Sequence, residues 1–177
     1  MALDPRPTSE RIKERLVWPS PGWICKDPGR LLMFGFGSGL IRPAPGTWGT
    51  LLAWGLWALA APSGPAWAIG LFLLVAYIYG CWAAGRVGRE LGVSDHSGMV
   101  WDEMVAFWLV LWLTPGTLAA QACAFVLFRV FDIAKPPPIR QFDLRLKNGF
   151  GAMFDDLLAA VFTLLVLALA IRLGAPL

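Results

Sequence analysis

The sequence is poor in charge and in the residues that build many soluble catalytic centres. Only 15% of its 177 residues are charged, against about 25% in ordinary soluble domains. It has one histidine, and its three cysteines are far apart without a CxxC spacing, which argues against a disulfide framework and a zinc site. The net charge is only +3, and the basic residues do not form a continuous stripe along the sequence. We therefore expect no nucleic-acid partner. Residues 1–30 are polar and rich in proline and contain no apolar run typical of a secretory signal.

Apolar residues, in contrast, are abundant. They make up 57% of the chain, and ten tryptophans favour a bilayer–water boundary. They gather in five segments, at about 48–61, 66–84, 99–114, 117–131 and 155–173. Several are shorter than the roughly 20 residues of a full crossing, which local thinning of the bilayer or protein contacts can accommodate. The alternative is that one or more of them is re-entrant or interfacial, which leaves the number of full crossings open. We therefore predict an all-α fold: a small polytopic membrane helical bundle over residues 31–177, preceded by a polar N-terminal arm over residues 1–30.

The connecting loops predict an orientation. Basic residues lie before the first segment and in the loops 85–98 and 132–154, whereas the loops 62–65 and 114–117 carry no charge. If each segment crosses once, all basic regions share one side, which the positive-inside rule makes cytoplasmic. The sequence thus predicts a polar catalytic cap on the cytoplasmic side of the membrane.

Two pairs of adjacent carboxylates begin apolar segments. Asp102-Glu103 starts the third segment and Asp155-Asp156 starts the fifth. One pair alone is compatible with a solvated or capped helix start. Ionisable groups inside membrane segments are nevertheless costly and usually functional, and two pairs on the same side supply the hard oxygen ligands that Mg²⁺ prefers. We predict a Mg²⁺ site formed by Asp102, Glu103, Asp155 and Asp156.

The stretch "FRVFDIAKPPPI" supplies cations beside these acids. Arg129, Asp132 and Lys135 recur at a spacing of three residues, which brings neighbours together on a helix. Asp132 is expected near a helix C-terminus, where the dipole disfavours an anion, so it needs Arg129 or a metal as a partner. Arginine and lysine next to carboxylates are typical of phosphate binding. The alternative is a basic patch that holds anionic lipid headgroups.

Two weaker signals lie elsewhere in the sequence. The glycine-rich stretch 35–50 lacks the GK[ST] of a P-loop, but its amides can form an anion nest, and we expect the Thr47 and Thr50 hydroxyls to cap the following helix and to bind substrate. His96, the single histidine, follows Asp95 and precedes the first acidic pair. It is a candidate for proton transfer, and a hydrogen-bonding role is the alternative.

Four blocks occur together in one order within residues 35–161: "GSGLIRPAPGTWGTLLA", "DHSGMVWDEMV", "FRVFDIAKPPPI" and "GFGAMFDDLLAAV". As a set they resemble the signature blocks of the phosphatidylglycerophosphatase A family. The resemblance implies a Mg²⁺-dependent phosphatase of the bacterial inner membrane that converts phosphatidylglycerophosphate to phosphatidylglycerol and phosphate. Ala106 and Asn148 depart from this pattern, since glycine is common in the family at both places.

Carried onto this sequence, the resemblance implies a set of site residues. The catalytic or metal-binding acids are Asp102, Glu103, Asp132, Asp155 and Asp156; Arg129 and Lys135 face phosphate, and His96 is a further site member. In the resulting hypothesis the cations neutralise phosphate charge, and either a carboxylate or His96 orients an attacking water or a carboxylate attacks directly. The main alternative is a small membrane transporter or channel with an acidic cytoplasmic vestibule, and a second is a non-catalytic lipid-binding protein.

Overall fold

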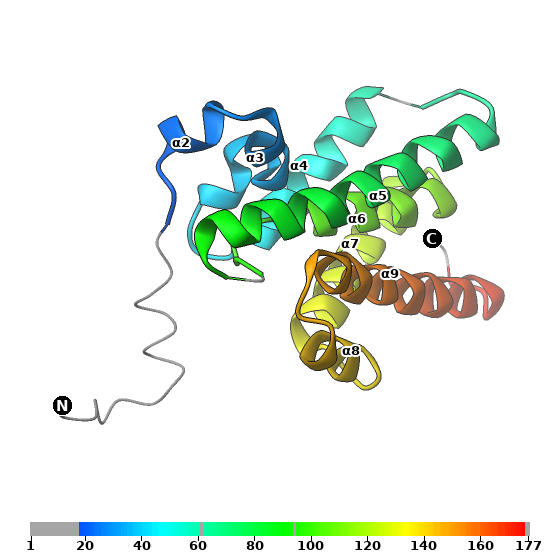
Figure 1. The fold of residues 1–177 in the computed structure, drawn as a ribbon. Helices are drawn as coiled ribbons and strands as arrows, with labels where there is room; N and C mark the ends of the chain where they lie inside the picture. The colour runs from blue at the N-terminus through cyan, green and yellow to red at the C-terminus, as the bar shows by residue number, and fades with distance from the viewer. Residues whose placement is uncertain (1–17, 61, 94, 176–177) are drawn as a thin grey trace.

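The computed structural model describes residues 18–60, 62–93 and 95–175, apart from the side chain of residue 143. Within these ranges every regular element is a helix, which confirms the all-α class (Figure 1). Residues 9–16 (SERIKERL), for which the sequence favours a short helix with Ser9 as a possible cap, lie outside the described residues.

Three short elements precede the long helices. They are α2 (Pro21–Cys25), α3 (Pro28–Met33) and the 3₁₀ helix η1 (Gly35–Leu40). Proline occupies the first turn of α2 and of α3, and the Ser20 and Asp27 side chains accept hydrogen bonds from backbone amides of those turns. Ile24 and Met33 are buried. The end of the expected polar arm is thus folded onto the rest of the protein, and the proposed boundary near residue 30 remains a prediction.

Ion pairs fasten these short helices to the longest one. Arg86 on α5 (Ala66–Leu91) pairs with Asp27, and Arg30 donates to Glu90 at 2.7 Å. The Arg86 guanidinium, together with the backbone amide of Arg30, lowers the pKa of Asp27 from 3.8 to about 2. Because Asp27 stays ionised at neutral pH, this bridge persists there.

The expected apolar segments all form helices. They are α4 (Pro45–Ala60), α5, α6 (Trp101–Leu113), α7 (Leu118–Ala134) and α9 (Gly149–Arg172), with the short α8 (Ile139–Arg145) between the last two. Their ends follow the local signals in the sequence: α5 ends at Gly92, which adopts a left-handed conformation, and α7 ends at Lys135 before three prolines.

Helix α9 lies at the centre of the helix contacts. It packs against α5, α6, α7 and α8, while α4 packs on the other side against α6. Gly149 lies against the backbone of α5 at Cys81 and Gly85, so α5 and α9 approach closely at this end, as small residues permit in helical membrane proteins. Phe107 and Phe128 fill the interior, with ring centroids 5.5 Å apart.

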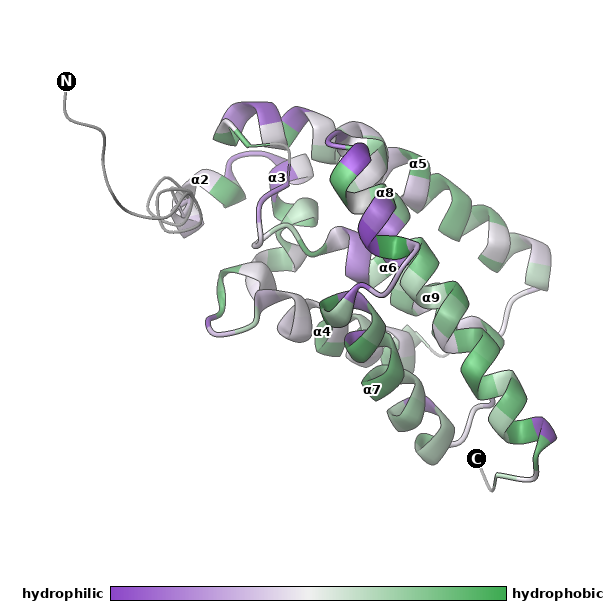
Figure 2. Cartoon of the chain, turned by 90° about the horizontal axis from the view of Figure 1, so that it is seen from below, coloured by the Kyte–Doolittle hydropathy of each residue, from purple (hydrophilic) through white to green (hydrophobic). Residues whose placement is uncertain are grey.

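The surface of the long helices is apolar. Only α5 and α9 are both long and apolar enough, among the described helices, to cross a membrane unaided. Figure 2 shows hydrophobic colour along α5, α7 and α9, whereas hydrophilic residues gather around α8 and the adjoining helix ends. The fold therefore separates an apolar body from a polar region.

The polar region forms because helix ends far apart in sequence converge. Gly46 at the start of α4 lies against Glu103 at the start of α6, and Lys135 at the end of α7 pairs with Asp155 in the first turns of α9. The acids that the sequence distributes over separate helices therefore share one end of the bundle.

Candidate active site

Three carboxylates form the centre of the site. Asp102, Glu103 and Asp156 each place one carboxylate oxygen within 4.8 Å of the others. Asp102 and Asp156 are buried, at 7% and 4% exposure. The second Glu103 oxygen, Oε2, is buried and has no hydrogen-bond partner within the described residues. Burial of several carboxylates together is unfavourable unless a cation compensates them.

Local helix geometry explains how neighbouring acids take different positions. On α6 both acids reach the centre, and the Asp102 side chain also accepts the backbone amide of Glu103 at 3.0 Å. On α9 successive side chains diverge by about 100°. Asp156 joins the three-carboxylate centre, whereas Asp155 forms an ion pair with Lys135. Of the four acids expected to bind metal, the structure thus gathers three, and the fourth lies beside them against a cation.

Arg129 contacts two acids of the site, Asp132 on its own helix and Glu103 on α6. Its guanidinium lies 2.7 Å from Asp132 and 3.8 Å from Glu103, and it donates to the Thr50 hydroxyl at 3.4 Å. Asp132 lies near the C-terminal end of α7, as expected, and Arg129 is the partner that this position requires. Both side chains of this ion pair are only 12% exposed.

These groups surround one cavity of about 280 Å³. Its acidic walls come from α6, α7 and α9, with the Arg129 and Lys135 cations among them. The full lining comprises Ala44, Pro45, Gly46, Asp95, Ser97, Met99, Asp102, Glu103, Arg129, Asp132, Ile133, Lys135, Asp155 and Asp156. A small, charged and partly closed cavity of this kind suits an anionic group that needs both a cation and donors.

The glycine-rich stretch contributes through close approach. A Cβ on Gly46 would overlap Glu103 Oε1 and would lie 3.0 Å from Arg129. Thr50 is buried one turn into α4, where its hydroxyl donates to the Gly46 carbonyl at 2.8 Å. Our expectation that Thr50 caps this helix was therefore wrong, because its hydroxyl is used inside the helix and accepts from Arg129. Thr47 lies outside the acidic cavity, beside Arg129 on a neighbouring surface pocket.

His96 is held away from the lining of the acidic cavity. It is 1% exposed, and its Nδ1 accepts the backbone amide of Gly98 at 3.0 Å. Its ring packs against Trp18, with centroids 4.9 Å apart, and against Phe34. His96 thus acts as a hydrogen-bond acceptor here, and its role in proton transfer remains a prediction.

The two sequence neighbours of His96, Asp95 and Ser97, both line the acidic cavity. The sequence analysis did not assign them to the site. Their presence in the same quoted block as His96 was the signal available.

Comparison with known proteins assigns the chain to a family. Residues 31–171 match the family model described as phosphatidylglycerophosphatase A. The chain belongs to the phosphatidylglycerophosphatase A family. The phosphatidylglycerophosphatase A of Haemophilus influenzae is 44% identical over 79% of this chain and 86% of that protein. The enzyme of the same name from Escherichia coli K12 is 37% identical over 77% of this chain and 80% of that protein.

A further relative carries a different name. A Bacteroides thetaiotaomicron protein, provisionally named a phosphatidylinositol-3-phosphatase, is 37% identical over 79% of this chain and 91% of its own length. No solved structure matches the chain.

Both departures from the family pattern fit their surroundings. Asn148 caps α9, because its side-chain oxygen accepts the amide of Gly151 at 2.9 Å. Ala106 is buried in α6 at 4% exposure, one helical turn after Asp102. Neither residue removes a charged group from the cavity.

Proposed function

We propose that this protein hydrolyses the terminal phosphate monoester of phosphatidylglycerophosphate, releasing phosphatidylglycerol and phosphate, with the reaction at the acidic cavity. The observation that carries the proposal is the meeting of Asp102, Glu103 and Asp156 in one cavity with Arg129 and Lys135. Family membership supplies the substrate class, since the relatives from H. influenzae and E. coli bear the name of this activity.

Mg²⁺ fits this set of residues. Asp102, Glu103 and Asp156 offer hard oxygen ligands within reach of one another, and the Glu103 Oε2 atom lacks any other partner in the described part of the chain. Their convergence supports these three residues as the ligands, with Asp155 and Lys135 beside them. When bound, the ion would supply Lewis-acid stabilisation of charge on the phosphate oxygens.

The protein's own groups account for binding and orientation. Arg129 and Lys135 present cations to the phosphate oxygens, where they offset charge that grows as the phosphoryl group is transferred. Asp132 and Asp155 hold these two cations in place. A carboxylate of the cavity acts next, by one of two routes. In the first, it accepts a proton from an attacking water while the phosphorus–oxygen bond to the lipid breaks, and the phosphatidylglycerol alkoxide takes up a proton from solvent. In the second, it attacks phosphorus, phosphatidylglycerol leaves and is protonated by solvent, and water then hydrolyses the acyl phosphate. Trapping a phosphorylated enzyme in a single turnover would distinguish the second route from the first.

We further propose that the protein is a multi-pass protein of the bacterial inner membrane, with the cavity facing the cytoplasm. The apolar surfaces of α5 and α9 and the basic loops near the cavity support this placement. Cysteine accessibility tests it in a variant whose three native cysteines are serine. A membrane-impermeant maleimide should label Ser63→Cys from the periplasmic side and Arg89→Cys only after the inner membrane is permeabilised. The reverse pattern would contradict the orientation.

The decisive assay is phosphate release from phosphatidylglycerophosphate by detergent-purified protein, with Mg²⁺ or with EDTA. We expect release that EDTA abolishes and added Mg²⁺ restores. Phosphatidylinositol 3-phosphate serves as a second test substrate, because one relative is provisionally named a phosphatidylinositol-3-phosphatase. If phosphate is not released from phosphatidylglycerophosphate, the proposed function is rejected. If it is released from neither lipid, the transporter alternative is favoured.

A matched pair of variants tests the centre itself. Glu103→Gln removes a charge from the cavity, and we expect it to lower kcat by about 100-fold or more, the scale of losing a charged group from a preorganised site. Glu90→Gln makes the same chemical change at the α3–α5 ion pairs, outside the cavity, and should retain activity. Equal activity in both variants would remove Glu103 from the mechanism.

A further inference from the structure

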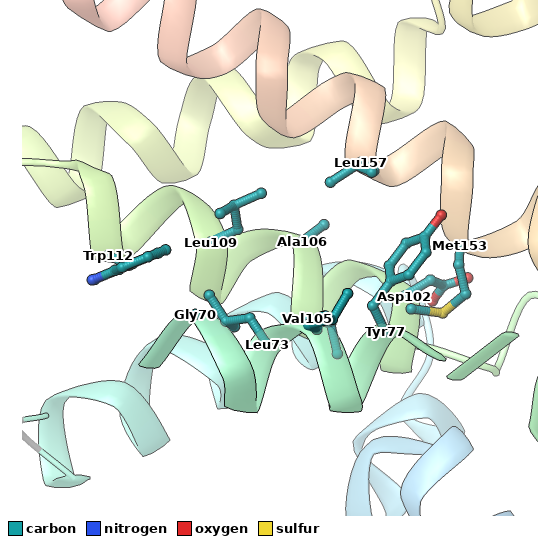
Figure 3. A pocket seen from close by; sticks show the side chains of 11 residues that line it. Gly70, Leu73, Tyr77, Asp102, Val105, Ala106, Leu109, Trp112, Met153 and Leu157 are labelled. Carbon is teal, nitrogen blue, oxygen red and sulfur yellow. The ribbon is translucent and has the colours of Figure 1, made fainter. Parts of the chain in front are cut away.

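A second cavity adjoins the acidic one and has the opposite character. It measures about 320 Å³ and lies between α5, α6 and α9 (Figure 3). Its walls are almost wholly apolar, from Gly70 and Leu73 on α5 to Leu109 and Trp112 on α6. It opens beside Leu74, which is 55% exposed on the apolar surface of the bundle. We call this space the α5–α6 groove.

The groove and the acidic cavity adjoin at one residue that lines both of them. Asp102, a member of the carboxylate centre, also forms part of the groove wall. Figure 3 shows Asp102 together with Tyr77 and Met153 at one end, while Trp112 and Gly70 lie at the other. A molecule with a charged head and an apolar tail can therefore occupy both spaces at once.

The length of the groove matches one lipid tail. Asp102 and Trp112 lie on the same helix, ten residues apart, which corresponds to about 15 Å at 1.5 Å per residue. The hydrocarbon core of a bilayer is about 30 Å thick, so one leaflet is about 15 Å deep. The groove extends over the depth of a single leaflet.

We propose that the α5–α6 groove holds one acyl chain of the lipid substrate, while the headgroup lies in the acidic cavity beyond Asp102. This inference rests on the proposed function, because it takes the phosphate monoester to lie in the acidic cavity. In a bilayer the surrounding tails are as apolar as the groove. The groove therefore orients the lipid and fixes the depth of its headgroup more than it extracts the chain from water.

Blocking variants at two depths test the groove. Gly70→Leu fills the far end, where a Cβ would lie 3.4 Å from Trp112 and so adds volume without overlap. Ala106→Phe fills the middle. The substrates are dipalmitoyl and dihexanoyl phosphatidylglycerophosphate in detergent micelles and the fully deacylated headgroup. We expect Gly70→Leu to lower kcat/KM about tenfold for the dipalmitoyl lipid, because a chain that no longer fits the groove misplaces the headgroup in the acidic cavity. The dihexanoyl lipid, whose chains do not reach this end, should be unaffected.

Ala106→Phe should lower kcat/KM for both lipids and leave the deacylated headgroup unchanged. Ala119→Phe makes the same substitution at an exposed position on α7 and should match the wild type on every substrate. If Gly70→Leu changes all three substrates equally, or none, the groove does not hold the substrate's chain. Hydrolysis of none of the three by the wild type would instead reject the proposed function.

Discussion

Gly46 offers a sharp test of how tightly the site is built. It lies in the first turn of α4, directly against Glu103 Oε1 and 3.0 Å from an Arg129 nitrogen, measured from the position of an added Cβ. Gly46→Ala introduces a single methyl group at this point. Because Arg129 is itself held by Asp132 and Thr50, we expect Glu103 to be the group that moves.

The size of the effect follows from the displacement. To restore ordinary van der Waals spacing, the Glu103 oxygen must shift by about 1 Å. A displacement of about 1 Å in a catalytic constellation costs about 100-fold in rate, which corresponds to about 2.7 kcal/mol of transition-state stabilisation. We therefore expect kcat/KM of Gly46→Ala to fall by about 100-fold while the protein remains folded.

The assay is phosphate release from phosphatidylglycerophosphate at saturating Mg²⁺, with thermal unfolding followed in parallel. Gly55→Ala is the matched control, because Gly55 lies on the same helix with no atom within 4 Å of its added Cβ. It should keep full activity. Wild-type kcat/KM in Gly46→Ala, or an equal loss in Gly55→Ala, would refute the close approach of α4 to Glu103.

Two further predictions concern charge. Lys135→Met removes the cation paired with Asp155 and should lower kcat/KM by roughly 10- to 100-fold, the value of a charged hydrogen bond. Lys135→Arg keeps the charge and should recover part of the lost activity. The control Lys26→Met, at an exposed site, should have no effect. Equal rates in the two methionine variants would contradict a phosphate-binding role. Arg86 lowers the pKa of Asp27 from 3.8 to about 2, so this bridge should stabilise the protein above pH 4 and be lost as the pH falls to about 2. The melting temperature of Asp27→Asn should therefore be less pH-dependent than that of the wild type in this window, and identical profiles would contradict the assignment.

The sequence determined the helices and their chemistry. Apolar runs bounded by proline and glycine predicted α4, α5, α6, α7 and α9, because apolar run length and helix-breaking residues are local properties. The limits of α4, α6 and α7 were close to those expected, whereas α5 continues to Leu91, past the expected end near 84, and α9 begins at Gly149, before the expected start at 155. The pairing of Arg129 with Asp132 was also predictable, since both lie on one helix at a spacing of three residues.

The roles of the individual helices depend on how they pack against one another. The separation of Asp155 from Asp156 depends on how α9 is rotated against α7, and the burial of His96 depends on Trp18 and Phe34, which lie far from it in sequence. The groove beside Tyr77 exists because α5, α6 and α9 meet around it. Such features depend on packing between distant segments, whose distances and rotations no local pattern encodes.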